Sequence, residues 1–129
     1  MNKGVELLKQ SGVFFLATND NGQPRVRPFG AVAEINDKLY ICTSNSKDCF
    51  KQMINNPKVE ISAMLGEHKW LRICGTVKPD SSIEAKAEFL KQYPLDMYKA
   101  DDGIFEIFCF TEGTLTVYSY TENPEIFEI

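Results

Sequence analysis

The chain has 129 residues, of which 43% are hydrophobic and 25% are charged, and its net charge is -4. This length and composition predict one compact domain over residues 1–129, with enough apolar side chains for a core. The negative charge excludes general binding of nucleic acids or anionic membranes, which uses broad basic surfaces. No apolar run approaches the roughly 20 residues that span a bilayer, and the first residues lack a signal-peptide core, so a cytoplasmic protein is expected.

Hydrophobic periodicity and turn residues predict three helices and about seven strands. The helices are expected at residues 2–11, 49–54 and 83–90, and their apolar faces include Cys49, Phe50, Met53 and Ile54, then Ile83, Ala87 and Leu90. The strands are expected at residues 13–18, 25–32, 39–43, 58–65, 69–77, 104–110 and 114–120. The first strand is expected to be fully buried, and a turn is expected at residues 112–113.

Short turns between consecutive strands favour an antiparallel arrangement over a parallel sheet. The expected fold is therefore mainly β, a closed or partly closed barrel with peripheral helices. The acidic C-terminal residues 122–129 allow two interpretations. They form either a frayed tail or a segment whose Phe127 and Ile129 pack on a partner subunit.

The strand that begins at Arg25 is the most informative segment, because it contains residues that ordinary strands avoid. Arg25 and Arg27 share one face by the two-residue period of a strand. Pro28 removes a donor from the ladder, and Gly30 lets another group approach the backbone. Two fixed cations beside an open backbone indicate a bound anion, the phosphate of a planar cofactor. The alternative is an edge strand whose charges only prevent aggregation.

A second candidate for anion binding joins a strand to the start of a helix at residues 43–47. Its members are Thr43, Ser44, Asn45, Ser46 and Lys47. Hydroxyls, a lysine and the positive end of the helix dipole converge there. The simpler interpretation is that Ser44 or Ser46 caps the helix and Lys47 is solvated. A hairpin centred near residues 36–37 is expected to place residues 27–30 opposite residues 43–46.

Trp70 and Arg72 lie on one face of a later strand. They either offer an aromatic wall and a cation to a flat ligand, or Trp70 caps the barrel and Arg72 pairs with an acidic neighbour. His68, the only histidine, is expected in a solvated turn.

The remaining candidates for chemistry are few. The four cysteines, which lack C-x-x-C spacing, are expected to be packed thiols, and no metal site is expected. Hydrolase, zincin and P-loop motifs are absent. A redox cofactor could still carry the chemistry of an enzyme without such motifs.

Several short motifs together resemble the pyridoxamine 5'-phosphate oxidase-like, FMN-binding split β-barrel family. They are Phe15-Leu-Ala-Thr18, Asp20-Asn-Gly22-Gln-Pro24, Arg25-Val-Arg27-Pro28, Leu39-Tyr40 with Thr43, Asn56-Pro57-Lys-Val59 and Arg72-x-x-Gly75. Each motif is weak alone, but their order and spacing are specific, and the resemblance covers residues 5–121. It implies a Greek-key split barrel that forms a homodimer, with FMN in a groove between the two subunits.

The resemblance also implies roles for individual residues. Arg27 matches the family's phosphate-contacting arginine, and the backbone of Pro28, Phe29 and Gly30 matches the segment beside the isoalloxazine edge. Thr43 matches a hydroxyl after the next strand. Ser46 and Lys47 match the phosphate loop, which also contains Ser44 and Asn45, with Lys51 as the alternative lysine. Arg25, Trp70 and Arg72 are expected beside the groove.

One departure from the family pattern bears on function. Residues 104–129 contain no arginine or histidine, whereas true pyridoxamine phosphate oxidases hold their substrate with both, so vitamin B6 oxidase activity is not expected. The chain is more similar to the small stand-alone members. We therefore expect a homodimeric FMN-binding oxidoreductase that acts on a small substrate. The alternatives are a module that stores or senses flavin without turnover, or a dimer that binds another phosphorylated ligand such as a deazaflavin. Heme, bound in other branches, is a weak option with one loop histidine.

Overall fold

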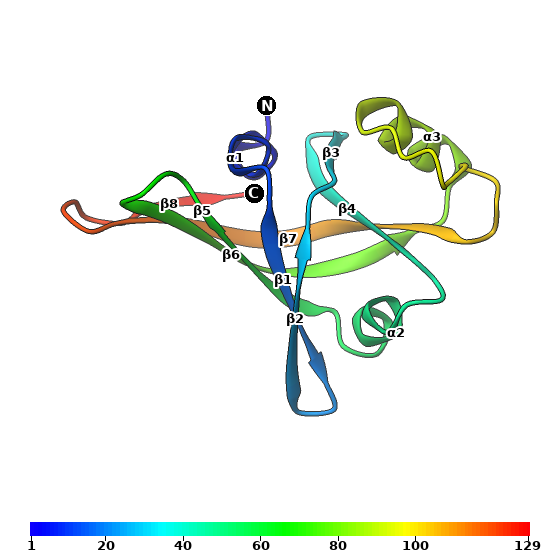
Figure 1. The fold of residues 1–129 in the computed structure, drawn as a ribbon, viewed down its shortest axis with the longest axis horizontal. Coiled ribbons are helices and arrows are strands. Elements are labelled where there is room, and N and C mark those ends of the chain that lie inside the picture. Colours follow the sequence, from blue (N-terminus) through cyan, green and yellow to red (C-terminus); the bar gives the residue numbers. More distant parts are fainter.

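A computed structural model describes all residues 1–129 and contains three helices and eight strands (Figure 1). The helices are α1 (Lys3–Ser11), α2 (Asp48–Asn55) and α3 (Ile83–Gln92). The strands are β1 (Phe14–Asp20), β2 (Gln23–Phe29), β3 (Val32–Ile35), β4 (Lys38–Ser44), β5 (Lys58–Met64), β6 (Lys69–Asp80), β7 (Phe105–Ser119) and β8 (Glu125–Glu128). The mainly β character is confirmed. No helix is both long and apolar enough to cross a membrane.

The strands form one antiparallel sheet in the order β2-β1-β5-β6-β7-β4-β3, and β8 pairs with β7. The two edge strands, β2 and β3, are joined by only two residues, Gly30 and Ala31. In a flat sheet six strand spacings would separate these edges by about 29 Å. The link from Phe29 to Val32 spans at most about 11 Å. The sheet must therefore curl until its edges meet at residues 30–31.

The main core fills the inside of this curled sheet. Its buried side chains include Leu8 of α1, Phe14 and Leu16 of β1, and Met53 of α2. A second cluster lies beneath α3, where Phe89 packs edge-to-face on Phe105. Helices α2 and α3 thus cover opposite flanks of the region where β2, the 30–31 link and β4 approach one another (Figure 1).

The predicted hairpin between the arginine strand and the strand after it is wrong. Asn36 and Asp37 do make a tight turn, with φ values of 52° and 62°, but the ladder on it runs only from Ile35↔Lys38 to Val32↔Ile41. The arginines belong to β2, which pairs with β1 instead. At Gly30 the chain passes from one edge strand of the sheet, β2, to the other, β3. The single strand predicted at residues 25–32 is therefore interrupted, and its residues belong to two strands.

The predicted turn at residues 112–113 is also wrong, because β7 continues through it as one strand of 15 residues. Gly113 lies opposite Gly75 on β6, next to a register shift between Thr76 and Val77. A Cβ on Gly75 would lie 2.7 Å from the carbonyl oxygen of Glu112. The glycines therefore allow two long strands to cross closely and bend, where the sequence suggested a reversal.

Two of the predicted buried surfaces need correction. Strand β1 is buried only on alternate residues, and Phe15 is 48% exposed. On α3 the buried residues are Ala85, Lys86 and Phe89, whereas Ile83 and Ala87 are exposed. A charged residue on the inner face hid this periodicity, because Lys86 is buried beside Glu106 at 3.3 Å.

The predicted burial of Ile54 and the predicted frayed C-terminal tail are also corrected. Ile54 on α2 is exposed, so the inner face of this helix is completed by Gln52 instead. The C-terminal residues are not frayed, since β8 pairs with β7 and Phe127 and Ile129 pack against the core of their own chain.

Candidate functional site

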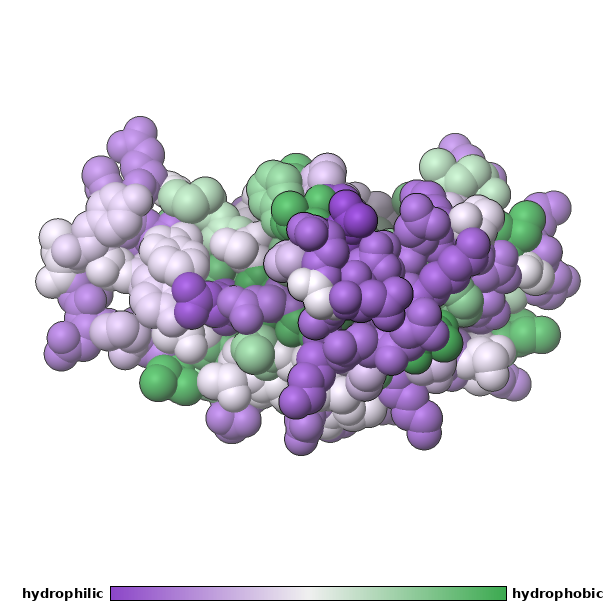
Figure 2. All heavy atoms as spheres, turned by 90° about the horizontal axis from the view of Figure 1, so that it is seen from below, coloured by the Kyte–Doolittle hydropathy of each residue, from purple (hydrophilic) through white to green (hydrophobic).

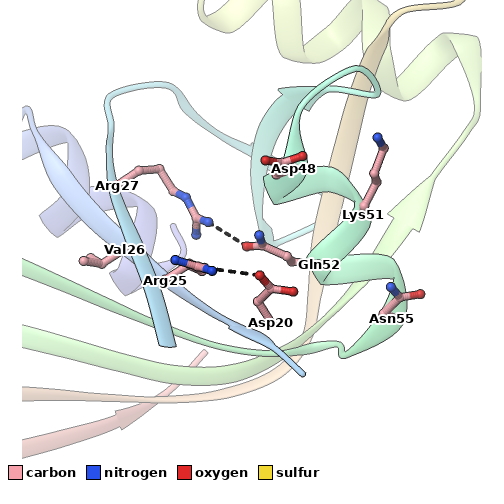
Figure 3. Close-up of a pocket in the computed structure, with 8 residues that line it drawn as sticks. All are labelled: Asp20, Arg25, Val26, Arg27, Asp48, Lys51, Gln52 and Asn55. Carbon is pink, nitrogen blue, oxygen red and sulfur yellow. Dashed lines mark hydrogen bonds and ion pairs between the residues drawn. The ribbon is translucent and has the colours of Figure 1, made fainter. Parts of the chain in front are cut away.

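Arg27 is a half-buried cation held by neutral groups only. It extends from β2 towards α2, and its guanidinium donates to Oε1 of Gln52 at 2.7 Å (Figure 3). It also donates to the carbonyl of Leu16 at 3.2 Å and to Oγ1 of Thr18 at 2.9 Å. No carboxylate lies within ion-pair distance. The hydrogen bonds fix the position of the guanidinium without cancelling its charge. Such a cation attracts an anion from solution.

A polar hollow of about 590 Å³ lies on one side of Arg27. It is lined by Asp20, Arg25, Val26, Arg27, Asp48, Lys51, Gln52 and Asn55 (Figure 3). Arg25 contributes little free charge here, because its Nε lies 3.2 Å from a carboxylate oxygen of Asp20. Lys51 has no ion-pair partner and is the second uncompensated cation of this hollow. Seen from below, the middle of the molecule carries a gathering of hydrophilic residues (Figure 2).

An apolar hollow of about 350 Å³ lies on the other side of Arg27. It is lined by Arg27, Pro28, Phe29, Gly30, Ala31, Cys42, Thr43, Lys47, Cys49, Tyr93, Leu95, Met97 and Tyr98. Arg27 belongs to both hollows, so the two adjoin at its guanidinium. Together they offer a charged end and an apolar end to one elongated ligand.

The link between β2 and β3 presents free backbone donors to the apolar hollow. The N–H groups of Gly30 and Ala31 make no hydrogen bond to another protein group, although Ala31 is 91% buried by its neighbours. A Cβ on Gly30 would lie 3.5 Å from the hydroxyl of Tyr93 and 3.7 Å from the carbonyl of Gly12. Buried N–H groups are nearly always paired, so the free donor of buried Ala31, with that of half-buried Gly30 beside it, is suited to a bound ligand.

The predicted segment at residues 43–47 divides into two groups. Thr43 and Lys47 line the apolar hollow, whereas Ser44 and Ser46 do not. The two serine hydroxyls bond to each other at 2.6 Å. Neither caps α2, because the N-cap residue is Lys47, which makes no side-chain cap hydrogen bond and leaves its ammonium free.

Asn45 connects two segments of the chain through hydrogen bonds. Its Nδ2 donates to the carbonyl of Gly103 at 2.8 Å and to Glu106 at 3.0 Å, and its backbone N–H donates to the carbonyl of Ile104. Glu106 also pairs with buried Lys86. Asn45 therefore ties the start of α2 to the segment before β7 and does not line either hollow.

Trp70 and Arg72 lie on a separate patch of the sheet. Arg72 pairs with Glu60 at 2.9 Å, and its guanidinium carbon lies 5.3 Å from the ring centroids of both Trp70 and Tyr118. The two rings stack at 4.3 Å. Neither Trp70 nor Arg72 lines the polar or the apolar hollow, and the acidic neighbour expected for Arg72 is Glu60.

Several residues of the site were missed from the sequence. Gln52 falls on the inner face of α2, one turn after Cys49, and that spacing could have revealed it. Ala31, Tyr93, Leu95, Met97 and Tyr98 gave no local signal, because the hollow they line joins segments about 60 residues apart.

All four cysteines are free thiols, and two of them line the apolar hollow. Burial raises the pKa of Cys42 to about 12, although Lys47 acts in the opposite direction. Burial also raises the pKa of Cys49, against the effects of Arg27 and Lys47. Both are thus protonated, apolar parts of the wall at neutral pH. Cys74 is exposed, so the expectation of packed thiols is wrong for that residue.

Comparison with known proteins bears on this site. The family model for pyridoxamine 5'-phosphate oxidase matches residues 2–123. A solved NimC/NimA family protein from Clostridium acetobutylicum is 50% identical, with a TM-score of 0.95 over 100% of this chain and 93% of that chain. No curated protein matches the sequence.

Two more distant structures share the fold. One is a pyridoxamine 5'-phosphate oxidase-related, FMN-binding protein from Nostoc punctiforme, with 16% identity and a TM-score of 0.57 over 92% of this chain and 87% of that chain. The other is a heme-binding protein from Mycobacterium smegmatis, with 15% identity and a TM-score of 0.74 over 94% of this chain and 54% of that chain. Because the family model covers nearly the whole sequence, the resemblance seen in the motifs is confirmed, and the chain belongs to the pyridoxamine 5'-phosphate oxidase family.

Proposed function

We propose that this protein binds FMN non-covalently and acts as a flavin-dependent oxidoreductase on a small substrate. The observation that carries the proposal is Arg27, an uncompensated cation where a polar hollow meets an apolar one. FMN has the matching form, with a phosphate at one end and a flat, mostly apolar ring at the other. The FMN-binding relative from Nostoc punctiforme supports the choice of this cofactor.

The residues around Arg27 fit such a ligand. Arg27 would neutralise the phosphate, helped by Lys47 or by Lys51, the two other free cations of the hollows. The N–H groups of Gly30 and Ala31 would donate to the edge of the ring. When bound, FMN supplies a two-electron carrier that the side chains of this chain do not provide. Donors fixed at the ring edge favour the negative charge of the reduced form.

Neither hollow contains a histidine that could ligate heme. His68, the only histidine, lies in the turn between β5 and β6, with its side chain 75% exposed, and lines neither hollow. A heme-binding relative of the same fold exists, yet this chain offers no axial histidine at the corresponding hollows. Flavin is therefore the better supported cofactor.

The direct experiment is to purify the protein, add FMN and measure the absorption spectrum and the quenching of flavin fluorescence. We expect a yellow complex of one FMN per chain, which is lost in the Arg27→Ala/Lys47→Ala double variant. Native mass spectrometry of the untreated protein shows whether FMN, a deazaflavin or another phosphorylated molecule travels with it. A protein that refuses FMN while remaining folded by circular dichroism would refute the proposal.

We also propose that the protein works as a homodimer in the cytoplasm with the cofactor between the subunits. The outer face of β1, β2 and β5 carries exposed apolar side chains, with Phe15 48%, Val26 67% and Met64 52% exposed. Val26 also lines the polar hollow, so a second copy on this face would lie beside the site. Patches of this kind commonly mark subunit contacts.

Sedimentation velocity of a charged variant tests the dimer. Phe15→Glu/Met64→Glu is expected to sediment as a monomer at concentrations where the unaltered protein is a dimer, and to bind FMN more weakly. The matched control is Ile83→Glu on α3, which changes a 57% exposed apolar residue outside this face. A monomeric unaltered protein, or a double variant that stays dimeric, would contradict this assembly.

Turnover is separated from storage by steady-state kinetics. Reduction of the FMN-loaded protein by NADH or NADPH, followed by reoxidation with a panel of small acceptors, is expected for an oxidoreductase. A protein that binds FMN but passes electrons to no acceptor faster than to oxygen would be a storage or sensing module instead.

A further inference from the structure

One side of the apolar hollow is formed by the segment between α3 and β7. Its contributing side chains are Tyr93, Leu95, Met97 and Tyr98, which we call the acceptor wall. The wall lines the same hollow as Pro28–Gly30 and Thr43, with the hydroxyl of Tyr93 next to Gly30, and none of its members is charged. Met97 is 71% exposed, so it lies at the mouth.

The charged residues of the same segment are kept out of the hollow. Asp96 lies between Leu95 and Met97, and Lys99 follows Tyr98, yet neither lines the hollow. The only charged groups in its lining are Arg27 and Lys47, neither of which belongs to the wall, and Arg27 also lines the polar hollow. A charged molecule against the wall would therefore lose water without gaining a counter-ion.

The wall still offers hydrogen bonds. The phenol groups of Tyr93 and Tyr98 have no protein hydrogen-bond partner, in contrast to Tyr40, which donates to Asp80 at 2.8 Å. A tyrosine hydroxyl donates readily to a carbonyl oxygen. The wall can thus bind a flat apolar molecule and fix an oxygen on it.

The wall is also held in place, as a binding surface must be. Asp102 accepts hydrogen bonds from the backbone N–H groups of Lys99 at 3.0 Å and of Ile104 and Phe105 at 2.8 Å each. The ring of Tyr98 packs on Phe105, with centroids 5.1 Å apart. The segment is therefore held in a fixed conformation, with its uncharged side chains lining the hollow and its charged side chains outside it.

We infer that the acceptor wall binds the electron-accepting substrate, and that this substrate is a flat, uncharged, conjugated molecule with a hydrogen-bond-accepting oxygen. The inference rests on the proposed function, since the ring of the cofactor would share this hollow with the substrate. It assigns discrimination against charged substrates to Leu95 and Met97, and orientation to Tyr93 and Tyr98.

Binding of two matched probes to the oxidised, FMN-loaded protein tests the inference. The probes are 1,4-naphthoquinone, which is uncharged, and 1,4-naphthoquinone-2-sulfonate, which has the same ring and a negative charge. Equilibrium dialysis is expected to show at least a 10-fold preference for the uncharged quinone. Met97→Glu should weaken its binding by at least 5-fold, and Tyr98→Phe by about 3-fold. Ile104→Glu, a change to a 48% exposed residue of the same segment outside the hollow, should have no effect.

FMN affinity, measured on the same samples by fluorescence quenching, separates the two hypotheses. Absence of FMN binding to the unaltered protein overturns the proposed function. Normal FMN binding with equal affinity for the two quinones overturns the inference alone. The same conclusion follows if Met97→Glu weakens FMN as much as it weakens the quinone, because the wall would then contact the cofactor itself.

Discussion

Two arginines on strands of the same sheet have opposite surroundings. Arg27 donates to a carbonyl, a hydroxyl and an amide, all neutral, and opens onto two hollows. Arg72 is paired with Glu60 at 2.9 Å, covered by two aromatic rings, and opens onto neither. Both were candidates from the sequence. They differ in the side chain that contacts each guanidinium. Arg27 contacts the neutral Gln52 of α2, whereas Arg72 contacts the carboxylate of Glu60 on β5.

The difference has an energetic side. The ion pair of Arg72 is 44% exposed on both partners, and such pairs typically contribute only about 0.2–1 kcal/mol to stability. A charge-assisted hydrogen bond between an arginine and an anion is worth about 1.5–3 kcal/mol. Arg27 retains that interaction for a ligand, because no carboxylate has already taken it. These contacts support the proposed binding at the Arg27 region and a role in surface packing for the Arg72 region.

Removing each arginine in turn should produce the largest difference between the regions. Arg27→Ala is expected to raise the Kd for FMN about 10- to 100-fold, the equivalent of about 1.5–3 kcal/mol of lost interaction. Arg72→Ala should change it less than 2-fold. Titration of FMN with fluorescence detection measures both. Equal losses in the two variants would show that the Arg72 region also contacts the cofactor, for example across a subunit interface.

Exchanging the residues that contact the two arginines tests whether the absence of a neighbouring carboxylate is what allows Arg27 to bind FMN. Gln52→Glu places a carboxylate beside Arg27 at the position of the present 2.7 Å hydrogen bond and should raise the Kd for FMN about 5- to 10-fold. The protein should stay folded, because the new pair resembles the one at Arg72. The reverse change, Glu60→Gln, frees Arg72 and serves as the control. It should give no new FMN binding, because no hollow adjoins that arginine. An unchanged Kd in Gln52→Glu would mean that the free charge of Arg27 is not what holds the phosphate.

The same comparison shows what the sequence could predict. The turn residues, the apolar periodicity and the order of motifs gave the mainly β fold, the ends of α1 and α2, the cationic strand with Arg27, and Lys47 at the start of α2. These features depend on local propensity and on residues close in the chain. The pairing of strands could not be read in this way. Gly30 looked like an interruption within one strand, but it is the point where the chain passes between the two edges of a curled sheet.

The site was predictable only where its residues are consecutive. Residues 27–30, Thr43 and Lys47, which line the hollows, were singled out because each belongs to a run with unusual composition. The acceptor wall lies more than 45 residues from the nearest of these runs, and it reaches the hollow through the packing of α3 on the sheet. The structural contacts of Asn45 could not be predicted for the same reason, since its partners Gly103 and Glu106 are distant in sequence. Tertiary contacts, which no local pattern encodes, decide these roles.

The smallest expected effect is a loss of local stability in acid. It should affect the segment of the acceptor wall and not the Arg72 region. The backbone N–H groups of Phe105, Lys99 and Ile104 hold the pKa of Asp102 below its ordinary value of 3.8. Because the pKa is lower in the folded state, the stabilisation is fully present above pH 3.8 and is lost as the pH falls through the folded-state pKa. We expect lower protection of the amide hydrogens at residues 99–105 below pH 4, once the measured rates are corrected for the slower intrinsic exchange in acid, and a weaker pH dependence of this protection in Asp102→Asn. Trp70 is the only tryptophan and lies in the Arg72 region, so its fluorescence should not follow this step. A fluorescence change coincident with the exchange would show that the whole molecule unfolds together and that Asp102 does not act locally on the acceptor wall.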